Sequence, residues 1–461
     1  MPSLKKRLTE NLKSNIFGED GSHSRLRNIK LLKAASSGAI ARGINMGSSL
    51  ISIPLMLNYL GLEQFGIWMA ITGFIGFLSF SDLGMGIGLQ NALSRCFGTN
   101  DDTSPKYYIS TSYFLLTAVA IIATLITTCL AHYFPISTLF SVHEPEAISA
   151  ALKTIQYTLI IFAWGIPVNL ISRVLSGYQN AHISNTLLAS GRLLGLIFIF
   201  FGVHSKLELA TLAGGFMAAP HIVQLVYSFL YFRKNPTHIP NWRFIRKTKM
   251  VEIVTSGGWV VIAKISDTMT QNLPILIISS GIGTAAAGTY AICQRLFGFA
   301  GMIINMSLQS LWPAYGEAYH RGDKKWISGA FKKSVIVTVT FSICISLPFI
   351  PFGRTIIELW TSNDQILPSR SLIFAFIMWT TVTNLSVAYT MLLNGTNNFK
   401  GQATYGVLVV SIGCIAAYIL GTKHGLTITV IIILSFEAIK CLLLGIESTK
   451  LIKGMRPNAT R

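Results

Sequence analysis

Charge is scarce in this chain: only 12% of its 461 residues are Asp, Glu, Lys or Arg. A soluble domain carries about 25% charged residues. Hydrophobic residues reach 51%, and the mean hydropathy is +0.54. This composition excludes a large soluble enzyme and indicates an integral membrane protein.

Several chemical signatures are also missing. The six cysteines have no paired spacing and the nine histidines have no metal-ligand spacing, so neither disulfides nor a metal site is expected. There is no Walker A sequence, and the glycine-rich stretch 84–88 follows no strand, so nucleotide binding is not predicted. We therefore expect no cofactor and no catalytic residue. A cleavable signal peptide is not recognisable, and the first apolar run is expected to act as its own insertion signal.

Long apolar runs are abundant instead. A helix needs about 20 residues to cross a hydrocarbon core of about 30 Å, whereas barrel strands are about ten residues long and alternate strictly. The fold class we predict is all-α, with twelve transmembrane helices in two halves of six. The predicted spans are 38–60, 66–90, 109–131, 150–172, 185–203, 210–232, 253–279, 285–311, 334–352, 370–393, 403–420 and 425–446.

The net charge of +19 follows from topology. If the chain starts in the cytoplasm and the spans alternate, 27 of the 37 basic residues lie on the inner side. Both termini are therefore predicted to be cytoplasmic. No nucleic-acid partner is expected, because no basic soluble domain is present to bind one.

The same reading divides the chain into five parts. The N-terminal tail, residues 1–37, is interpreted as a topology signal, and the alternative is an amphipathic helix that lies on the inner membrane surface. The parts are a basic cytoplasmic tail at 1–37, an N-terminal six-helix bundle at 38–232, a basic cytoplasmic linker at 233–250, a C-terminal six-helix bundle at 251–446 and a cytoplasmic tail at 447–461.

The two halves repeat each other at a spacing of 222 residues. Arg42 in the first span corresponds to Lys264 in the seventh, and the pattern Gly61-x4-Gly66 corresponds to Gly283-x4-Gly288. Internal repeats are how many transporters build a site at a pseudo-symmetric interface. Because each half has an even number of spans, we expect the axis to run along the membrane normal.

Each cation of this pair leads a polar stripe on one face of its helix, at i, i+3 and i+7. A Lys or Arg near the bilayer centre costs about 2.5–3.5 kcal/mol and usually faces a cavity. We therefore predict a cationic lumen. The alternatives are that Lys264 forms a salt bridge with Asp267, and that the amide and hydroxyl side chains form hydrogen bonds between helices. The two stripes are Arg42, Asn45 and Ser49, and Lys264, Asp267 and Gln271.

Other charged residues inside the runs are secondary candidates. Arg295 and Arg192 would add positive potential to the lumen, with snorkelling an equal alternative for Arg192. Arg95 and Arg173, near cytoplasmic span ends, are candidates for an inner gate, although the positive-inside rule alone explains both. Carboxylates raise their pKa when desolvated and can couple transport to an ion or balance nearby cations. The candidates are Asp82, Asp267 and Glu317, whereas Glu437 and Lys440 are expected to pair.

The segment Tyr59-Leu60-Gly61-Leu62-Glu63-Gln64-Phe65-Gly66-Ile67-Trp68, followed by Phe80-Ser81-Asp82-Leu83-Gly84, resembles the Wzx-type polysaccharide repeat-unit flippases. These belong to the multidrug/oligosaccharidyl-lipid/polysaccharide exporter superfamily. The resemblance implies two pseudo-symmetric six-helix bundles around a V-shaped central cavity. It also implies transfer of an undecaprenyl-pyrophosphate-linked oligosaccharide, such as an O-antigen unit, to the periplasmic leaflet of a bacterial inner membrane by alternating access. The partners it implies are this lipid-linked substrate, membrane lipids, a polysaccharide polymerase and a chain-length regulator.

Two other functions remain open from the residues alone. A proton- or sodium-coupled drug antiporter of the same superfamily would use Asp82 and Asp267, but the stripes lead with cations, which favour an anionic pyrophosphate. A membrane-embedded glycosyltransferase or polymerase would need a large outer loop or a clustered acidic site. The outer loops predicted here are short, so this class is disfavoured.

Overall fold

The structure is a computed structural model that describes residues 22–78, 82, 84–133, 145–255, 258–309, 311–363, 368–396 and 398–455. Almost all of these residues are helical, and no strand occurs among them. The first half contains α2 (Ser22–Phe77), α3 (Met85–Gly98), α4 (Pro105–Tyr133), α6 (Pro145–Val168), α7 (Leu170–Gly177), α8 (Ala181–His204) and α9 (Leu209–Lys234). The connection is made by η2 (Pro236–His238), η3 (Trp242–Phe244) and α10 (Lys247–Thr255). The second half contains α11 (Gly258–Gly281), α12 (Thr284–Gln309), α13 (Leu311–Arg321), α14 (Lys324–Ser346), α15 (Phe349–Thr361), α16 (Arg370–Gly395), α17 (Phe399–Ala416), η4 (Ala417–Gly421), η5 (Thr422–His424) and α18 (Leu426–Gly454).

The predicted all-α membrane fold is confirmed, and the number of spans depends on how bends are counted. Within the described residues, nine helices are long and apolar enough to cross a membrane, or ten if the bent α12 counts as one span. Two features explain the difference from twelve. First, α2 runs through the first predicted span and into the second, 66–90, where it ends at Phe77, and only Gly61, with φ 77° and ψ 168°, interrupts its helical backbone. The end of that second span lies in α3. Second, α11 carries the polar stripe and falls outside the apolar set.

Glycine permits the bend in α2 because it alone adopts a positive φ without steric cost. The bend sends the second part of the helix back across the molecule. The N-terminal part of α2 begins at Ser22, so residues 22–37 continue directly into the first span.

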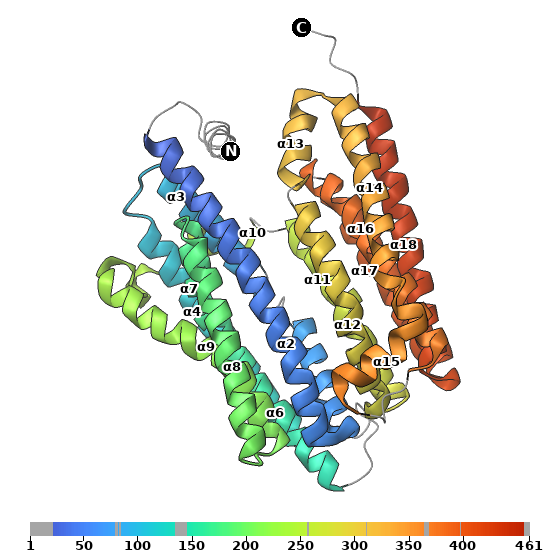
Figure 1. Cartoon of the computed structure of the whole chain (residues 1–461). Coiled ribbons are helices and arrows are strands. Elements are labelled where there is room, and N and C mark those ends of the chain that lie inside the picture. The colour runs from blue at the N-terminus through green and yellow to red at the C-terminus, as the bar shows by residue number, and fades with distance from the viewer. Residues whose placement is uncertain are drawn as a thin grey trace, which may run out of the picture.

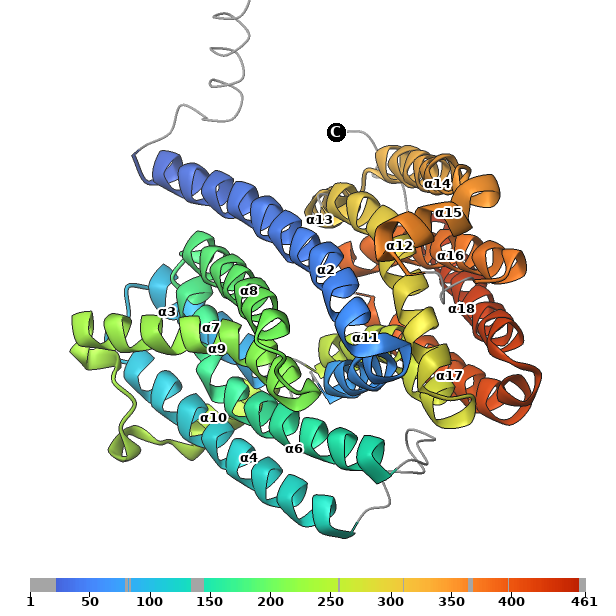
Figure 2. The same cartoon turned by 60° about the horizontal axis from the view of Figure 1, so that its bottom comes forward.

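The helices form two bundles, and α2 lies along the boundary between them. One bundle contains α2 to α9 and the other contains α11 to α18, as Figures 1 and 2 show. The bundles approach each other near α15 and diverge toward the end where α2 begins and α18 ends (Figure 1). The predicted V shape is thereby confirmed.

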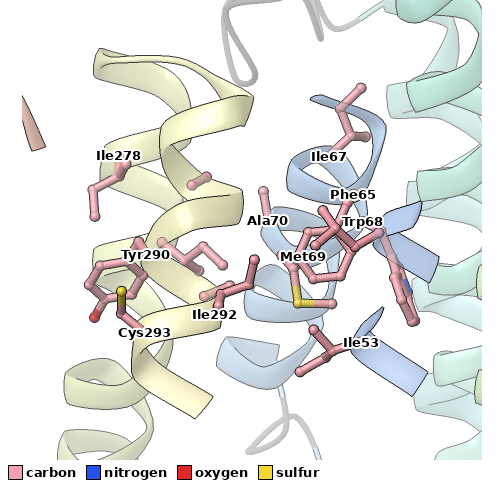
Figure 3. Close-up of a cluster of buried hydrophobic side chains, with 14 of the residues drawn as sticks. Ile53, Phe65, Ile67, Trp68, Met69, Ala70, Ile278, Tyr290, Ile292 and Cys293 are labelled. Carbon is pink, nitrogen blue, oxygen red and sulfur yellow. The ribbon is translucent and has the colours of Figure 1, made fainter. Parts of the chain in front are cut away.

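Hydrophobic packing continues across the narrow end of the V. The largest buried cluster includes Phe65 and Met69 of α2 together with Ile278 of α11 and Ile292 of α12. Figure 3 shows Ala70 and Met69 on one side and Ile292 on the other. The two bundles therefore share one apolar core at this end.

Candidate functional site

Arg42, predicted to face a cationic lumen, lies at the boundary between the bundles. Its side chain is exposed, and its Nη1 donates a hydrogen bond of 3.0 Å to Oε1 of Gln309. Arg42 belongs to α2 and Gln309 to the last turn of α12, so this bond crosses from one bundle to the other. Sequence analysis did not identify Gln309, because an isolated glutamine near a helix end carries no distinctive pattern.

Arg192 and Arg295 place one further guanidinium group on each bundle. Arg192 is on α8 and Arg295 on α12, and the two cations are close enough to interact electrostatically. Arg192 is half-buried, with its guanidinium carbon 5.7 Å from the centre of the Phe216 ring. None of the salt bridges among the described residues involves Arg42, Arg192 or Arg295. Uncompensated cations of this kind attract an anion into a cleft.

The second predicted stripe lies on α11. The side chain of Lys264 is outside the described residues, so its pairing with Asp267 stays a prediction. Asp267 and Gln271 are exposed and line a cavity inside the second bundle. The backbone oxygen of Gln271 accepts a hydrogen bond of 2.8 Å from Nε2 of Gln294.

In the first stripe, Asn45 is exposed and Ser49 is half-buried. Both are on α2, within two turns of Arg42. The backbone oxygen of Ser49 accepts a hydrogen bond of 3.3 Å from Ser52. Both residues thus share the predicted polar stripe with Arg42.

The two other candidate coupling carboxylates have local structural roles. Oδ1 of Asp82 accepts a hydrogen bond of 3.0 Å from the backbone of Gly84, where α3 begins. Glu317 is exposed on α13 and forms an ion pair of 2.6 Å with Arg321, one turn away. The desolvation that motivated Glu317 as a coupling group is therefore absent.

Arg95 holds the connecting segment against the first bundle. It forms a short ion pair with Glu252 of α10 and donates a hydrogen bond of 2.9 Å to the Tyr108 hydroxyl. That hydroxyl lies 2.7 Å from Glu252 and also accepts a hydrogen bond from Lys249. The hydrogen bond from Tyr108, assisted by Arg95, holds the pKa of Glu252 below its usual value. Arg95 thus anchors the linker.

Arg173, the other gate candidate, faces the first bundle rather than the second. It is on α7, and its Nη1 lies 3.5 Å from the side-chain oxygen of Gln90. Both Arg173 and Asp82 approach Gly86, which leaves space for them because it has no side chain. The described neighbours of Arg173 are therefore all within the first bundle.

The narrow end of the V is closed by a backbone contact between the two repeats. A methyl group at Gly66 of α2 would lie 1.8 Å from the carbonyl oxygen of Thr284. A methyl group at Gly288 of α12 would lie 3.1 Å from the carbonyl oxygen of Leu62. Positions 62 and 284 differ by 222 residues, as do 66 and 288, so the contact is reciprocal under the repeat. Corresponding segments of the two halves therefore contact each other at the closed end.

Side-chain hydrogen bonds reinforce this closure. The side chain of Asn58 donates a hydrogen bond of 3.1 Å to the backbone oxygen of Thr361. The indole nitrogen of Trp360 donates one of 2.9 Å to the backbone oxygen of Leu50. Both bonds join α2 to α15. Opening this end requires breaking them and separating the glycine contact.

The second bundle encloses a cavity of about 570 Å³ between α11, α12, α16, α17 and α18. Glu437 and Lys440, which line it, form the expected ion pair at 2.7 Å, and both side chains are buried. Lys440 also lies 3.3 Å from the hydroxyl of Thr270. Apart from this pair and the stripe on α11, sequence analysis missed the cavity, because its lining comes from six helices, with Trp312 contributed by α13, and shares no motif.

The two helical bundles and their apolar spans define a two-bundle membrane protein. An inward-facing structure of a multidrug resistance MATE-family transporter has a TM-score of 0.73 at 15% identity, covering 89% of this chain and 99% of that one. The structure of a MOP superfamily transporter from Pyrococcus furiosus has a TM-score of 0.65 at 14% identity, and the match covers 93% of this chain and 96% of that one. The fold is therefore that of the predicted superfamily.

The chain belongs to the family of polysaccharide biosynthesis proteins, whose profile matches residues 31–319. It is 20% identical over 425 residues to a Yersinia pseudotuberculosis protein assigned to O-antigen export, covering 84% of this chain and 92% of that protein. A Salmonella typhimurium protein assigned to O-antigen transport is 22% identical over 434 residues, and the match covers 87% of this chain and 96% of that protein. The resemblance drawn from the first two spans is confirmed.

Proposed function

We propose that this protein moves an oligosaccharide linked to undecaprenyl pyrophosphate from the cytoplasmic to the periplasmic leaflet of a bacterial inner membrane. The observation that carries the proposal is the set of arginines at the boundary between the bundles, where Arg42 hydrogen-bonds across to Gln309 and the charges of Arg192 and Arg295 interact. Guanidinium groups bind phosphate oxygens through paired, charge-assisted hydrogen bonds. The assignment of relatives to O-antigen export supports the glycan part of the substrate.

Transport would proceed by alternating access. The bundles diverge toward the end where α2 begins and α18 ends, and the proposed topology places this end in the cytoplasm. The headgroup enters there, while the polyprenyl chain stays in the lipid. Separation of Gly66 from Thr284 then opens the opposite end, as in other transporters with two rocking bundles. A polymerase and a chain-length regulator would receive the product.

The test is binding of undecaprenyl pyrophosphate to the purified protein in nanodiscs. A charge-assisted hydrogen bond contributes about 1.5–3 kcal/mol, so Arg42→Ala and Arg295→Ala should each weaken binding by about ten- to a hundredfold. Arg233→Ala, at the exposed end of α9, removes the same charge outside the cleft and should leave affinity unchanged.

A deletion strain provides the cellular counterpart. Loss of long surface polysaccharide should be restored by the parent and by Arg233→Ala, but not by the double variant Arg42→Ala, Arg295→Ala. Full restoration by that double variant would refute the proposed cleft. Ethidium efflux with unchanged surface glycans would favour the drug antiporter, for which Asp267 in the second-bundle cavity is the candidate coupling group.

A further inference from the structure

The cavity inside the second bundle adjoins the cationic cleft. Gln309, which accepts the hydrogen bond from Arg42, also lines this cavity. Its volume of about 570 Å³ falls within the range of about 300–1,000 Å³ typical of small-molecule sites. A molecule whose phosphate lies at Arg42 can therefore extend directly into this space.

The charged side chains that the structure describes in the cavity wall do not favour a second anionic headgroup as its ligand. Glu437 and Lys440, which both line the cavity, neutralise each other. A free pyrophosphate would therefore find no available cation among the described residues of this wall. The cavity is therefore suited to an uncharged polar molecule.

Besides the hydroxyl of Ser386, three buried polar groups on the cavity wall have no hydrogen-bond partner among the described residues. They are the indole nitrogen of Trp379, the side-chain oxygen of Asn394 and the side-chain oxygen of Gln402. These side chains are only 5%, 9% and 7% exposed. Buried polar groups are nearly always paired in proteins, so each of these marks a place for a ligand or a water. The terminal torsions of Asn and Gln are soft, which lets both amides turn toward the cavity.

The same wall presents aromatic rings beside the amides. Trp379 packs edge-on against Phe376, with ring centres 5.5 Å apart, and both residues line the cavity. A pyranose ring has apolar C–H faces that pack on aromatic rings and hydroxyls that both donate and accept hydrogen bonds. A hydrocarbon chain would fill the volume but would leave the amides unpaired.

We propose that this cavity is the saccharide site of the transporter. It binds uncharged pyranose rings of the glycan while the pyrophosphate lies at the arginines of the cleft, an inference that rests on the proposed function. Gln402, Asn394 and Trp379 are the residues that recognise hydroxyl groups. The sugar-binding role thereby belongs to the second bundle, and the phosphate-binding role is shared by both.

The experiment uses the full chain in nanodiscs and two separate probes. The first is the host's own repeat-unit oligosaccharide, released from its lipid by mild acid and free of phosphate. The second is undecaprenyl pyrophosphate without sugar. Ligand-observed NMR titration measures both dissociation constants for the parent and for Gln402→Leu, Asn394→Leu and Trp379→Phe.

The matched control is Gln224→Leu in α9. Gln224 is 1% exposed and hydrogen-bonds to Ser172, so this variant also removes a buried amide, but in the first bundle. Thermal unfolding of each variant identifies any that fails to fold. Trp379→Phe keeps an aromatic ring in place, so it still tests the cavity if the leucine variants do not fold.

The expected result is saturable binding of the free oligosaccharide, weakened about tenfold or more in the cavity variants and unchanged in Gln224→Leu. Undecaprenyl pyrophosphate should bind all of them equally. The saccharide site is overturned if the oligosaccharide does not bind while the lipid pyrophosphate does, or if the cavity variants bind it like the parent. If neither probe binds the parent, the proposed transport function fails as well.

Discussion

Substituting Gly66 by alanine should force open the narrow end of the V. The added methyl group would lie 1.8 Å from the carbonyl oxygen of Thr284, whereas real contacts of this kind stay beyond 3.0 Å. The helices α2 and α12 must therefore move apart by about 1.2 Å, and because the obstacle is backbone, no side-chain rotation can relieve it. Overpacking of this kind costs about 1–3 kcal/mol. The population of the closed end should fall by about five- to a hundredfold.

The pseudo-symmetric position provides an internal comparison. At Gly288 the nearest atoms are the Leu62 side chain at 3.0 Å and its carbonyl oxygen at 3.1 Å, so Gly288→Ala needs only a small adjustment. Gly47, also on α2, has open space around it, and Gly47→Ala is the matched control. The predicted order of opening is Gly66→Ala, then Gly288→Ala, then Gly47→Ala.

The assay is a spin-label distance measurement across the closed end. Labels at the exposed positions Gln64 and Ala285 report the separation of α2 from α12. The exposed thiols Cys129 and Cys344 are first replaced by serine. If the distance distribution in Gly66→Ala matches that of the parent, or if Gly288→Ala opens more, the reasoning from this contact is wrong.

Three further predictions concern charge. Glu437→Gln leaves Lys440 buried without its partner and should lower stability by about 3–5 kcal/mol, whereas adding Lys440→Met should recover most of it; equal melting temperatures for the single and double variants would contradict this. Because the folded-state pKa of Glu252 is lowered, its stabilising effect is present above its unfolded pKa and is lost as the pH falls through its folded pKa. The melting temperature of Glu252→Gln should therefore lie below that of the parent at pH 7, and the difference should disappear as the pH falls through the folded-state pKa of Glu252. A difference that persists below that pKa would argue against the ion pair. Arg295→Gln reduces repulsion with Arg192, so spin labels across the open end should report more of the closed form without ligand, and an unchanged distribution would contradict this.

Sequence reasoning was most successful where the signal is local and periodic. Long apolar runs predicted the membrane fold, and the spacing of Glu437 and Lys440 predicted their pair because residues at i, i+3 meet on any helix. The 222-residue repeat predicted corresponding glycines but not that they touch. That contact depends on how two distant helices cross, which no local pattern specifies.

Predictions failed or stayed incomplete where the answer depended on tertiary neighbours. Glu317 had the same local appearance as a buried carboxylate, yet the short helix α13 leaves it exposed beside Arg321. The cavity amides Asn394 and Gln402 looked like ordinary polar residues near span ends. Only the packing of α16 and α17 against α11 and α18 turns them into the wall of one cavity.

The arrangement of charges and contacts explains how transport could require its substrate. The glycine contact lets the narrow end close tightly with no ligand, because it is made of backbone and apolar side chains. Closing the wide end would bring Arg192 and Arg295 closer together in a medium of low dielectric, where like charges repel strongly. A pyrophosphate between them reverses the sign of that interaction. On the proposed function, the empty protein therefore rests with the cleft open to the side of its termini, and the anionic headgroup supplies the free energy that closes it.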